Sequence, residues 1–353
     1  MSALDPVTHF LTGACLSRAG LNRTTGLATL TMVLATEVPD IDVLWFFGGS
    51  VTGFAHHRGF THTLLGAPVM AAITVGGVYG LYYLLRQRLR RKARLEPRWG
   101  LLFVYALAGV LVHIFQDFTN NYGVRPFAPL HPRWYSWDIV SIIDPIMLAA
   151  LTLGLLVPAL FGLVTEEVGA GPARYRGRGG ALFALLALAA IIGLRDFEHR
   201  RAVTALNSIT YRGEDPIRAS AFPYPLNPFT WGGVVETRDF FEIVQADSSS
   251  GEIDPSNEAV LRFKPAETPV TLAAKKSRLG RFYLDWAQYP FLRVQSLAGN
   301  SGYRIQFQDL RFAYARTLSR NSSSPLSGYV ELDPQLIVTD QYMGAPPDRE
   351  RPR

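Results

Sequence analysis

The chain lacks three features that would narrow its class at once: it has a single cysteine, no internal repeat and no recognisable export signal. Because Cys15 stands alone, a framework of intrachain disulfides is excluded, although the compartment is left open. The first residues, MSALDPVTHFLTG, contain no basic stretch followed by an apolar one, so we expect no cleaved signal peptide. The 353 residues are enough for two domains.

Long apolar runs are what the sequence has instead. Hydrophobic residues make up 48% of the chain, its mean hydropathy is positive, and most of the apolar runs precede residue 195. A membrane-spanning helix needs about 20 mostly apolar residues. We expect four such helices, at residues 63–85, 101–118, 146–164 and 181–194. The runs 11–20 and 24–38 are too short to span, so we expect a re-entrant hairpin with Arg18 and Arg23 at its tip.

The net charge of +6 raises the question of nucleic-acid binding. The arginines, however, cluster in the short links 86–98 and 173–180 between apolar runs, which is typical of cytoplasmic loops that set membrane orientation. We therefore expect no nucleic-acid partner. With these links in the cytoplasm, residues 54–62, 117–145 and those after 195 face outward, and the hairpin returns both its ends to that outer side.

After residue 195 the composition of the sequence changes. Segments such as TWGGVVETRDFFEIVQAD and GYRIQFQDLRFAYA are rich in β-branched and aromatic residues and punctuated by Gly, Pro and Asn, which predicts five to seven strands. The expected fold class is a polytopic α-helical membrane domain, with four or more spans plus the re-entrant hairpin, followed by a small β-rich extramembrane domain. We place the helical membrane domain with its metal site at residues 1–198, the β-rich outer (periplasmic) domain at 199–342 and a disordered tail at 343–353.

Four polar clusters interrupt the apolar sequence of the first domain. They are DPVTHFLTG with His9, EVPDID with Asp40 and Asp42, HHRGFTH with His56, His57 and His62, and HIFQD with His113 and Asp117. His113 and Asp117 are four residues apart on an expected helix, so both side chains lie on one face. A divalent ion binds imidazole and carboxylate together, and its charge offsets the cost of holding carboxylates near a low-dielectric region.

Binding of a catalytic metal ion would explain why these residues occur in one domain. A catalytic zinc ion lowers the pKa of a bound water to about 7, which makes hydroxide available as a nucleophile at neutral pH. If Asp40 or Asp117 bridges, a second ion fits about 3.5–4 Å away, an arrangement suited to phosphoester hydrolysis. Arg58 would hold a phosphate oxygen by paired hydrogen bonds and stabilise developing negative charge. Asp42 or Asp144 would act as general base or orient a ligating imidazole.

Each cluster also has a simpler explanation. A lone histidine is commonly just hydrogen-bonded, PDID suits a helix cap, the histidine pair suits a solvated loop, and Asp144 before Pro145 suits the start of a helix. The pair His113 and Asp117 is hardest to explain in this way, because ionisable groups inside a membrane usually have a functional partner. Two other functions stay open: a transporter that relays protons or ions, and a non-enzymatic membrane-anchored interaction protein with a structural metal.

The order of the motifs THFLTG, PDID, HHRGFTHT, HIFQD and SIIDP resembles the family of LexA-binding, inner-membrane-associated hydrolases, also described as membrane-bound metal-dependent hydrolases. This resemblance implies an integral bacterial inner-membrane protein with a helical core and a hydrolytic metal site. More distantly, the order is similar to zinc-dependent phospholipase C, an all-helical class that binds a cluster of zinc ions and cleaves phosphoesters. That similarity implies ligands at His9, Asp40 or Asp42, His57, His62, His113 and Asp117, although no later His-x3-Glu or His-x3-Asp motif follows.

Together these observations predict a membrane-bound metal-dependent hydrolase of the bacterial inner membrane, with its site and C-terminal domain on the outer face. Its cofactor is expected to be one or two divalent ions, most simply zinc. The expected ligands are His9, Asp40, His56, His57, His62, His113 and Asp117, and the expected catalytic residues are Asp42, Arg58 and Asp144. The expected partners are membrane lipids and a substrate whose phosphoester belongs to a lipid or lipid-linked molecule.

Overall fold

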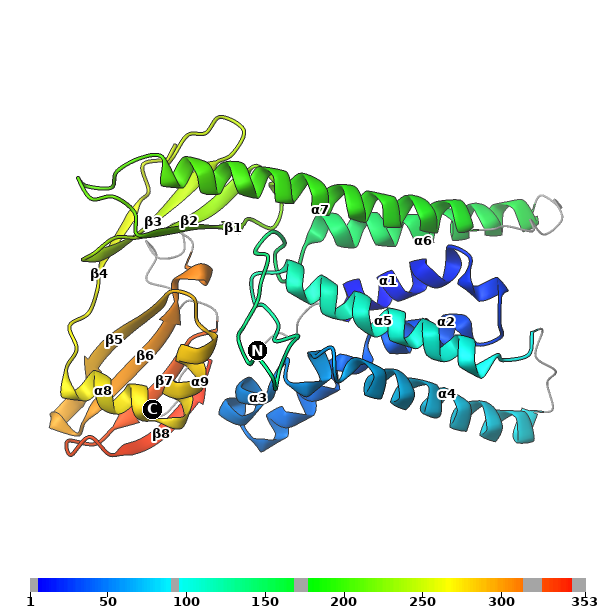
Figure 1. The fold of residues 1–353 in the computed structure, drawn as a ribbon, viewed down its shortest axis with the longest axis horizontal. Coiled ribbons are helices and arrows are strands. Elements are labelled where there is room, and N and C mark those ends of the chain that lie inside the picture. Colours follow the sequence, from blue (N-terminus) through cyan, green and yellow to red (C-terminus); the bar gives the residue numbers. More distant parts are fainter. Residues whose placement is uncertain (1–5, 90–94, 168–176, 314–325, 345–353) are drawn as a thin grey trace. The chain divides into compact units, whose positions relative to one another are not determined.

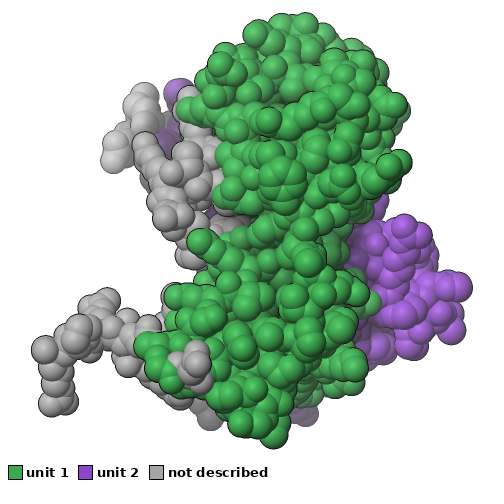
Figure 2. Space-filling model, turned by 90° about the vertical axis from the view of Figure 1, so that its left-hand side faces the viewer, with its two compact units in different colours: residues 1–2, 43–57, 196–353 green, residues 3–42, 58–195 purple. Residues whose placement is uncertain are grey.

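The computed structural model describes residues 6–89, 95–167, 177–313 and 326–344 (Figure 1). The chain divides into two compact units (Figure 2). Residues 3–42 and 58–195 form what we call the helical unit, and residues 1–2, 43–57 and 196–353 form the β unit. The expected disordered tail lies outside the described residues from position 345 onward, as do parts of both basic links.

The helical unit begins with a hairpin of two short helices. These are α1 (Pro6–Arg18) and α2 (Ala28–Ala35), joined by η1 (Leu21–Arg23). Gly13 of α1 allows their close approach, because a Cβ at this position would lie 2.4 Å from the Thr36 hydroxyl and 3.1 Å from the Met32 carbonyl oxygen. The hairpin corresponds in position to the two apolar runs that are too short to span a membrane.

Three helices among the described residues are long and apolar enough to cross a membrane. They are Ala67–Arg86 of α4 (Ala67–Leu89), α5 (Trp99–Thr119) and α7 (Arg178–Asn207), while α6 (Pro145–Glu167) contributes a shorter apolar helix, Pro145–Phe161. Small residues bring α6 and α7 together: a Cβ on Gly154 would lie 2.5 Å from the Cβ of Ala184, a packing mode common between helices in membranes. The expected helical membrane region is confirmed, whereas four or more spans stay a prediction.

The β unit contains two antiparallel sheets of four strands each. Strands β1 (Arg218–Pro223), β2 (Thr230–Glu236), β3 (Phe240–Asp247) and β4 (Val260–Phe263) pair in that order, as do β5 (Pro290–Ser296), β6 (Tyr303–Asp309), β7 (Gly328–Leu332) and β8 (Val338–Met343). This confirms the expected β-rich C-terminal domain, with one strand more than the upper number predicted.

Helices cover one face of each sheet within the β unit. The end of α7 packs its Ala202 and Leu206 against Trp231 and Val235 of β2, and Gly233 between them leaves room, since a Cβ there would lie 2.7 Å from a Leu206 methyl. Alternate residues of β2 therefore face α7, as strand geometry requires. The second sheet packs against α8 (Pro269–Lys276) and α9 (Arg278–Trp286).

One segment departs from the expected domain boundary at residue 198. Residues 43–57, which include α3 (Ser50–His56), group with the β unit although they precede the spanning helices in sequence. The Phe54 ring stacks 5.8 Å from Tyr283 and meets the Trp286 ring edge-on at 5.3 Å. The Ser50 hydroxyl also accepts the backbone N–H of Met343 in β8 at 3.0 Å. The boundary between the two units is therefore crossed more than once along the chain.

Candidate metal centre

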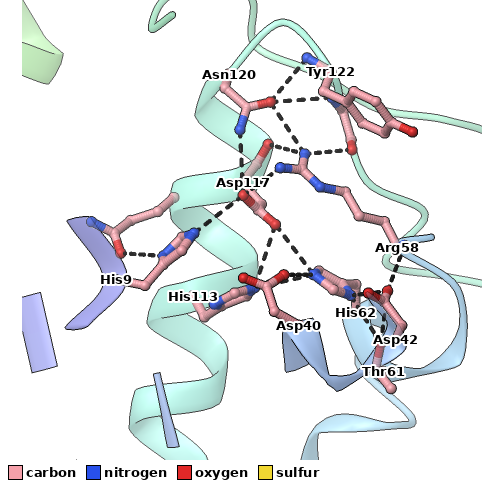
Figure 3. Close-up of polar contacts among 12 residues, drawn as sticks. His9, Asp40, Asp42, Arg58, Thr61, His62, His113, Asp117, Asn120 and Tyr122 are labelled. Carbon is pink, nitrogen blue, oxygen red and sulfur yellow. Dashed lines mark hydrogen bonds and ion pairs between the residues drawn. The ribbon is translucent and has the colours of Figure 1, made fainter. Parts of the chain in front are cut away.

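Four side chains from three separate segments converge in the helical unit (Figure 3), and we call them the four-residue centre. Asp40 lies in η2 (Val38–Gly48), His62 ends η3 (Phe60–His62), and His113 and Asp117 occupy adjacent turns of α5. One potential ligand atom of each residue lies within 4.8 Å of the other three. Since α4 begins shortly after His62 and α5 ends shortly after Asp117, the centre lies at one end of two spanning helices.

Five distances among the four groups are close to those between neighbouring ligands of a four-coordinate ion. The Nε2 atoms of His62 and His113 are 3.1 Å apart. Asp40 Oδ1 lies 3.4 Å from His62 Nε2 and 3.6 Å from His113 Nε2, and Asp117 Oδ2 lies 3.3 and 3.4 Å from the same two nitrogens. Metal–ligand bonds of about 2.0–2.1 Å in tetrahedral geometry separate neighbouring ligand atoms by about 3.3–3.4 Å. An ion between the four groups would thus meet the bond lengths of zinc with little rearrangement.

Two carboxylate oxygens at the centre suit a cation for a further reason. Asp40 Oδ1 and Asp117 Oδ2 are buried and accept no hydrogen bond from the described residues. A buried acceptor without a donor is costly, and more so when it is charged. Only 2% of the Asp117 side chain is exposed, against 20% for Asp40, so water reaches the centre mainly on the Asp40 side. The residues present therefore fit a divalent ion.

Each imidazole is held so that its Nε2 points into the centre. His113 Nδ1 lies 2.8 Å from the Thr36 carbonyl oxygen, to which it can only donate, so the ring's lone pair is on Nε2. His62 Nδ1 lies 3.0 Å from the Thr61 hydroxyl and 3.3 Å from Asp42 Oδ2. A carbonyl or carboxylate behind the imidazole is typical of metal-binding histidines. Of the two roles expected for Asp42, its geometry fits that of the group that orients an imidazole.

Arg58 holds the other oxygen of Asp117. Its Nη2 donates to Asp117 Oδ1 at 2.6 Å, while Nη1 donates to Asn120 Oδ1 at 3.2 Å and to the Gly123 carbonyl at 2.8 Å. The guanidinium also lies 4.8 Å from the centre of the Tyr122 ring, and the whole side chain is buried. Because protein acceptors already surround it, Arg58 fits a role in aiming Asp117 Oδ2 at the centre better than the expected contact with a phosphate.

The carboxylates favour positive charge at His62. Burial lowers the pKa of His62, but its close contacts with the carboxylates of Asp117, Asp40 and Asp42 raise it, so that the pKa lies well above the usual 6.5. Burial likewise raises the pKa of Asp40, but its close contact with His62 and the charges of His113 and His62 together lower it more, so the pKa lies below the usual 3.8. In the metal-free protein a proton therefore resides among these groups, and a divalent ion would displace it.

His9 lies beside the centre rather than in it. Gln116 Nε2 donates to the Thr12 hydroxyl at 2.9 Å, so Gln116 Oε1 is the acceptor for His9 Nδ1, 3.0 Å away. This arrangement puts the proton of a neutral His9 on Nδ1 and turns Nε2 toward Asp117 Oδ1 at 3.4 Å. His9 is therefore placed to exchange a proton or a hydrogen bond with a molecule bound beside Asp117 Oδ1.

A partly open pocket adjoins the same side of Asp117. Polar groups of its lining come from His9, Asp117, Asn120, Ser141 and Asp144, and its volume of about 30 Å³ has room for water. Every residue of this pocket belongs to the helical unit. The pocket gives water access to the edge of the four-residue centre.

The third expected catalytic residue, Asp144, lines this pocket but is engaged elsewhere. Its Oδ1 accepts the backbone N–H groups of Ile146 and Met147, both at 3.0 Å, at the start of α6. Its Oδ2 forms an ion pair with Arg195 at 2.7 Å. These contacts match the simpler explanation given for Asp144, that of a residue that starts a helix.

His56 and His57 belong to the β unit, unlike the other expected ligands. The His56 ring stacks 4.4 Å from the Trp45 ring, and the His57 ring lies 6.3 Å from that of Phe46. Neither is a member of the four-residue centre, and their assignment as ligands stays a prediction.

Several supporting groups were not expected from the sequence. The Thr36 carbonyl carries no side-chain signal, so no motif could have revealed it. Thr61 and Gln116 lie within the quoted motifs HHRGFTH and HIFQD, and Asn120 lies three residues after the second, but such polar side chains are common in loops and at helix ends. Only the folded arrangement shows that each contacts a ligand or its neighbour.

Comparison with known proteins places the chain in a family. The family model for the YdjM inner membrane protein matches residues 4–202, which is more than half of the chain and includes the whole four-residue centre. The protein YfhP of Bacillus subtilis (strain 168) is 24% identical over 158 residues, a match that covers 40% of this chain and 42% of YfhP. No solved structure gives a significant match. The chain belongs to the YdjM inner membrane protein family.

Proposed function

We propose that this protein is a membrane-bound metal-dependent hydrolase whose zinc ion is bound by Asp40, His62, His113 and Asp117. The observation that carries the proposal is the set of five distances, 3.1 to 3.6 Å, between the two inward Nε2 atoms and the two carboxylate oxygens. No hydrogen bond from the described residues satisfies those oxygens. Two carboxylates and two imidazoles so close together support the binding of a divalent cation.

The ligand set supports a catalytic ion over a structural one. Structural zinc sites are usually closed and rich in thiolate, whereas this centre uses only nitrogen and oxygen ligands. The Asp40 side chain is partly exposed, and a pocket reaches Asp117. A bound zinc ion would supply Lewis acidity and lower the pKa of a water molecule at an open position. His9, which lines the pocket with its Nε2 3.4 Å from Asp117 Oδ1, would accept or return a proton there.

A phosphoester in a lipid or lipid-linked molecule is the proposed substrate. The centre lies at the ends of α4 and α5, which are long and apolar enough to span a membrane. Apolar side chains next to its ligands are exposed: Ile41 by 47%, Phe60 by 55% and Leu64 by 45%. A lipid headgroup could thus reach the centre without leaving the bilayer surface. A second ion beside His9, an outward-facing site and C-terminal domain, and a fourth span are further parts of this proposal.

The test combines metal analysis with activity. Detergent-purified wild type should contain zinc and release phosphate or a phosphorylated headgroup from a panel of phospholipids and lipid-linked phosphates. The variants His113→Ala and His62→Ala should lose both metal and activity, while His131→Ala, at an exposed loop histidine, should keep both. Wild-type metal content in both ligand variants would refute the ligand assignment, and a zinc-loaded protein inert on every substrate would refute the hydrolase.

A structural metal in a non-enzymatic interaction protein is the second proposal, because four protein ligands can by themselves complete a tetrahedron. Cobalt substitution distinguishes the two. An open coordination position would show as a change in the visible spectrum when inorganic phosphate is added, whereas a closed tetrahedral site would keep its spectrum.

A further inference from the structure

A run of exposed apolar side chains follows the ligand Asp40 directly. The exposed fractions are 47% for Ile41, 48% for Val43, 54% for Leu44, 51% for Trp45 and 90% for Phe47. These residues belong to η2, which is not one of the spanning helices. An exposed apolar cluster of this kind marks an interaction surface rather than a stable water-facing surface.

The segment is also free of charge and too short to span. From Val43 to Ala55 the sequence VLWFFGGSVTGFA contains no Asp, Glu, Lys or Arg. Insertion of its apolar side chains into the headgroup region would therefore bury no ionised group, a cost that usually keeps loops out of lipid. Tryptophan and other aromatic rings are preferred at this depth of a membrane.

The segment has a fixed shape before it meets any partner. Phe46 packs tightly onto the backbone of α3, since a Cβ on Gly53 would lie 2.3 Å from the Phe46 ring. Its neighbours Trp45 and Phe47 are exposed, and His56 stacks on Trp45 at 4.4 Å. The anchoring of α3 through Phe54 to α9 continues this packing into the β unit. The exposed rings are thus presented by a folded element.

Chain continuity locates the segment at the membrane boundary. Val43 follows Asp42, whose Oδ2 accepts the Arg58 backbone N–H at 2.7 Å in the helical unit, nine residues before α4 begins at Ala67. The chain therefore ties residues 43–47 to Asp40 of the four-residue centre, which lies where α4 begins and α5 ends, whatever the arrangement of the two units. The surface available to them there is the lipid headgroup region.

We infer that residues 43–47 form an interfacial anchor, through which the β unit binds the lipid surface separately from the spanning helices. The apolar composition, the exposed aromatic rings, the lack of charge and the covalent attachment beside a span all favour lipid over a second protein. The inference depends on the membrane location of the chain and not on the hydrolase, so the two can fail independently.

The test uses the full chain in vesicles of phosphatidylethanolamine and phosphatidylglycerol. In a Cys15→Ala background, Phe47→Cys carries an environment-sensitive fluorophore, and lipids with a doxyl group near the headgroup or near the chain end serve as quenchers. We expect blue-shifted emission, strong quenching by the shallow doxyl lipid, weaker quenching by the deep one and protection from aqueous iodide. Because Phe47 is 90% exposed, its replacement removes few contacts of the fold.

Three reference positions make the result decisive. Leu186→Cys, on an exposed position of α7, should report lipid, and Ser250→Cys, in an exposed turn of the β unit, should report water. Leu226→Cys is the matched control, an apolar side chain of the β unit that is 71% exposed. Iodide quenching at position 47 equal to that at position 250 would overturn the inference. Protection of position 47 from both iodide and the doxyl lipids would also overturn it, as would doxyl quenching that is equal at positions 47 and 226. The second outcome would point to a covering protein or a second copy.

Discussion

Two buried aspartates, one in each unit, show how differently the two regions treat a negative charge. In the β unit, Asp309 accepts backbone N–H groups of Gln288, Tyr289 and Arg311, and the Arg311 Nε as well, at 2.8 to 3.3 Å. In the helical unit, Asp117 has one oxygen held by Arg58 at 2.6 Å and the other turned to two imidazole nitrogens and no donor.

The difference in hydrogen-bond donors distinguishes a structural carboxylate, Asp309, from one that is available to bind a ligand, Asp117. Both side chains are almost completely buried, so burial alone does not distinguish them. What distinguishes them is the donor count: both Asp309 oxygens are satisfied by the protein, whereas Asp117 Oδ2 depends on a cation or a proton. A buried carboxylate with an unsatisfied oxygen beside two lone pairs is therefore the more useful marker of function.

The largest expected effect comes from Asp117→Asn. An amide is a poor metal ligand and removes one of the two negative charges of the centre. We expect bound zinc to be lost and hydrolysis to fall by more than about 100-fold, beyond the effect typical of residues that only support a ligand. Metal content by elemental analysis and initial rates on the best lipid substrate measure this.

Asp309→Asn provides the matched control in the β unit. It leaves the buried guanidinium of Arg311 without its counter-charge, which should destabilise the β unit by about 3–5 kcal/mol. Zinc content should remain that of wild type. Loss of metal from this variant, or retention of metal by Asp117→Asn, would remove the distinction between the two carboxylates.

Arg58→Met tests the pairing that leaves Asp117 Oδ2 available. Without the guanidinium, the buried Asp117 carboxylate lacks its counter-charge, and we expect the metal-free protein to lose about 3–5 kcal/mol of stability. Zinc should restore part of this loss, because the ion supplies positive charge to the same carboxylate. Arg311→Met should be destabilised to a similar extent but show no recovery with zinc. Thermal unfolding of both variants with zinc and with a chelator gives the comparison.

The sequence predicts some parts of the fold and of the four-residue centre better than others. The apolar runs predict the helical membrane region because lipid requires about 20 apolar residues in a row, and β-branched alternation predicts the β-rich part. The spacing of His113 and Asp117 predicts a shared helix face from local geometry alone. Asp40 and His62 come from irregular segments, whose course depends on tertiary packing, so their convergence on α5 was a hypothesis until the fold was known.

Neighbouring histidines show the limit of motif reading. His56, His57 and His62 lie within seven residues, yet only His62 joins the four-residue centre, because the first two end a segment that groups with the β unit. Arg58 illustrates the same limit in another way. From the sequence its guanidinium could pair with a substrate phosphate or with a carboxylate of the protein, and its burial beside Asp117 favours the carboxylate.

A smaller effect is expected from Asp42→Asn, which weakens the group behind His62. Residues that orient a ligating histidine commonly contribute about 10–100-fold to metal affinity, so zinc should still bind but dissociate at higher chelator concentration. Competition with a chromophoric chelator measures this. Asp239→Asn, an exposed carboxylate of the β unit, should leave affinity unchanged. An Asp42→Asn affinity equal to that of wild type would show that Thr61 alone holds the His62 tautomer.

The smallest expected effect is on the pH dependence of stability, because a proton and a zinc ion compete for the same site. The pKa of His62 is raised by folding, so its protonation stabilises the metal-free protein fully below the unfolded pKa near 6.5, and this contribution is lost as pH rises through the folded pKa. Zinc must displace that proton, so its stabilising effect should instead grow with rising pH, by up to about 1.4 kcal/mol per pH unit for each proton released. Unfolding midpoints between about pH 6 and 9, with zinc and with chelator, should diverge in this way. In His62→Gln both slopes should flatten, and a wild-type slope in that variant would mean that another group carries the proton.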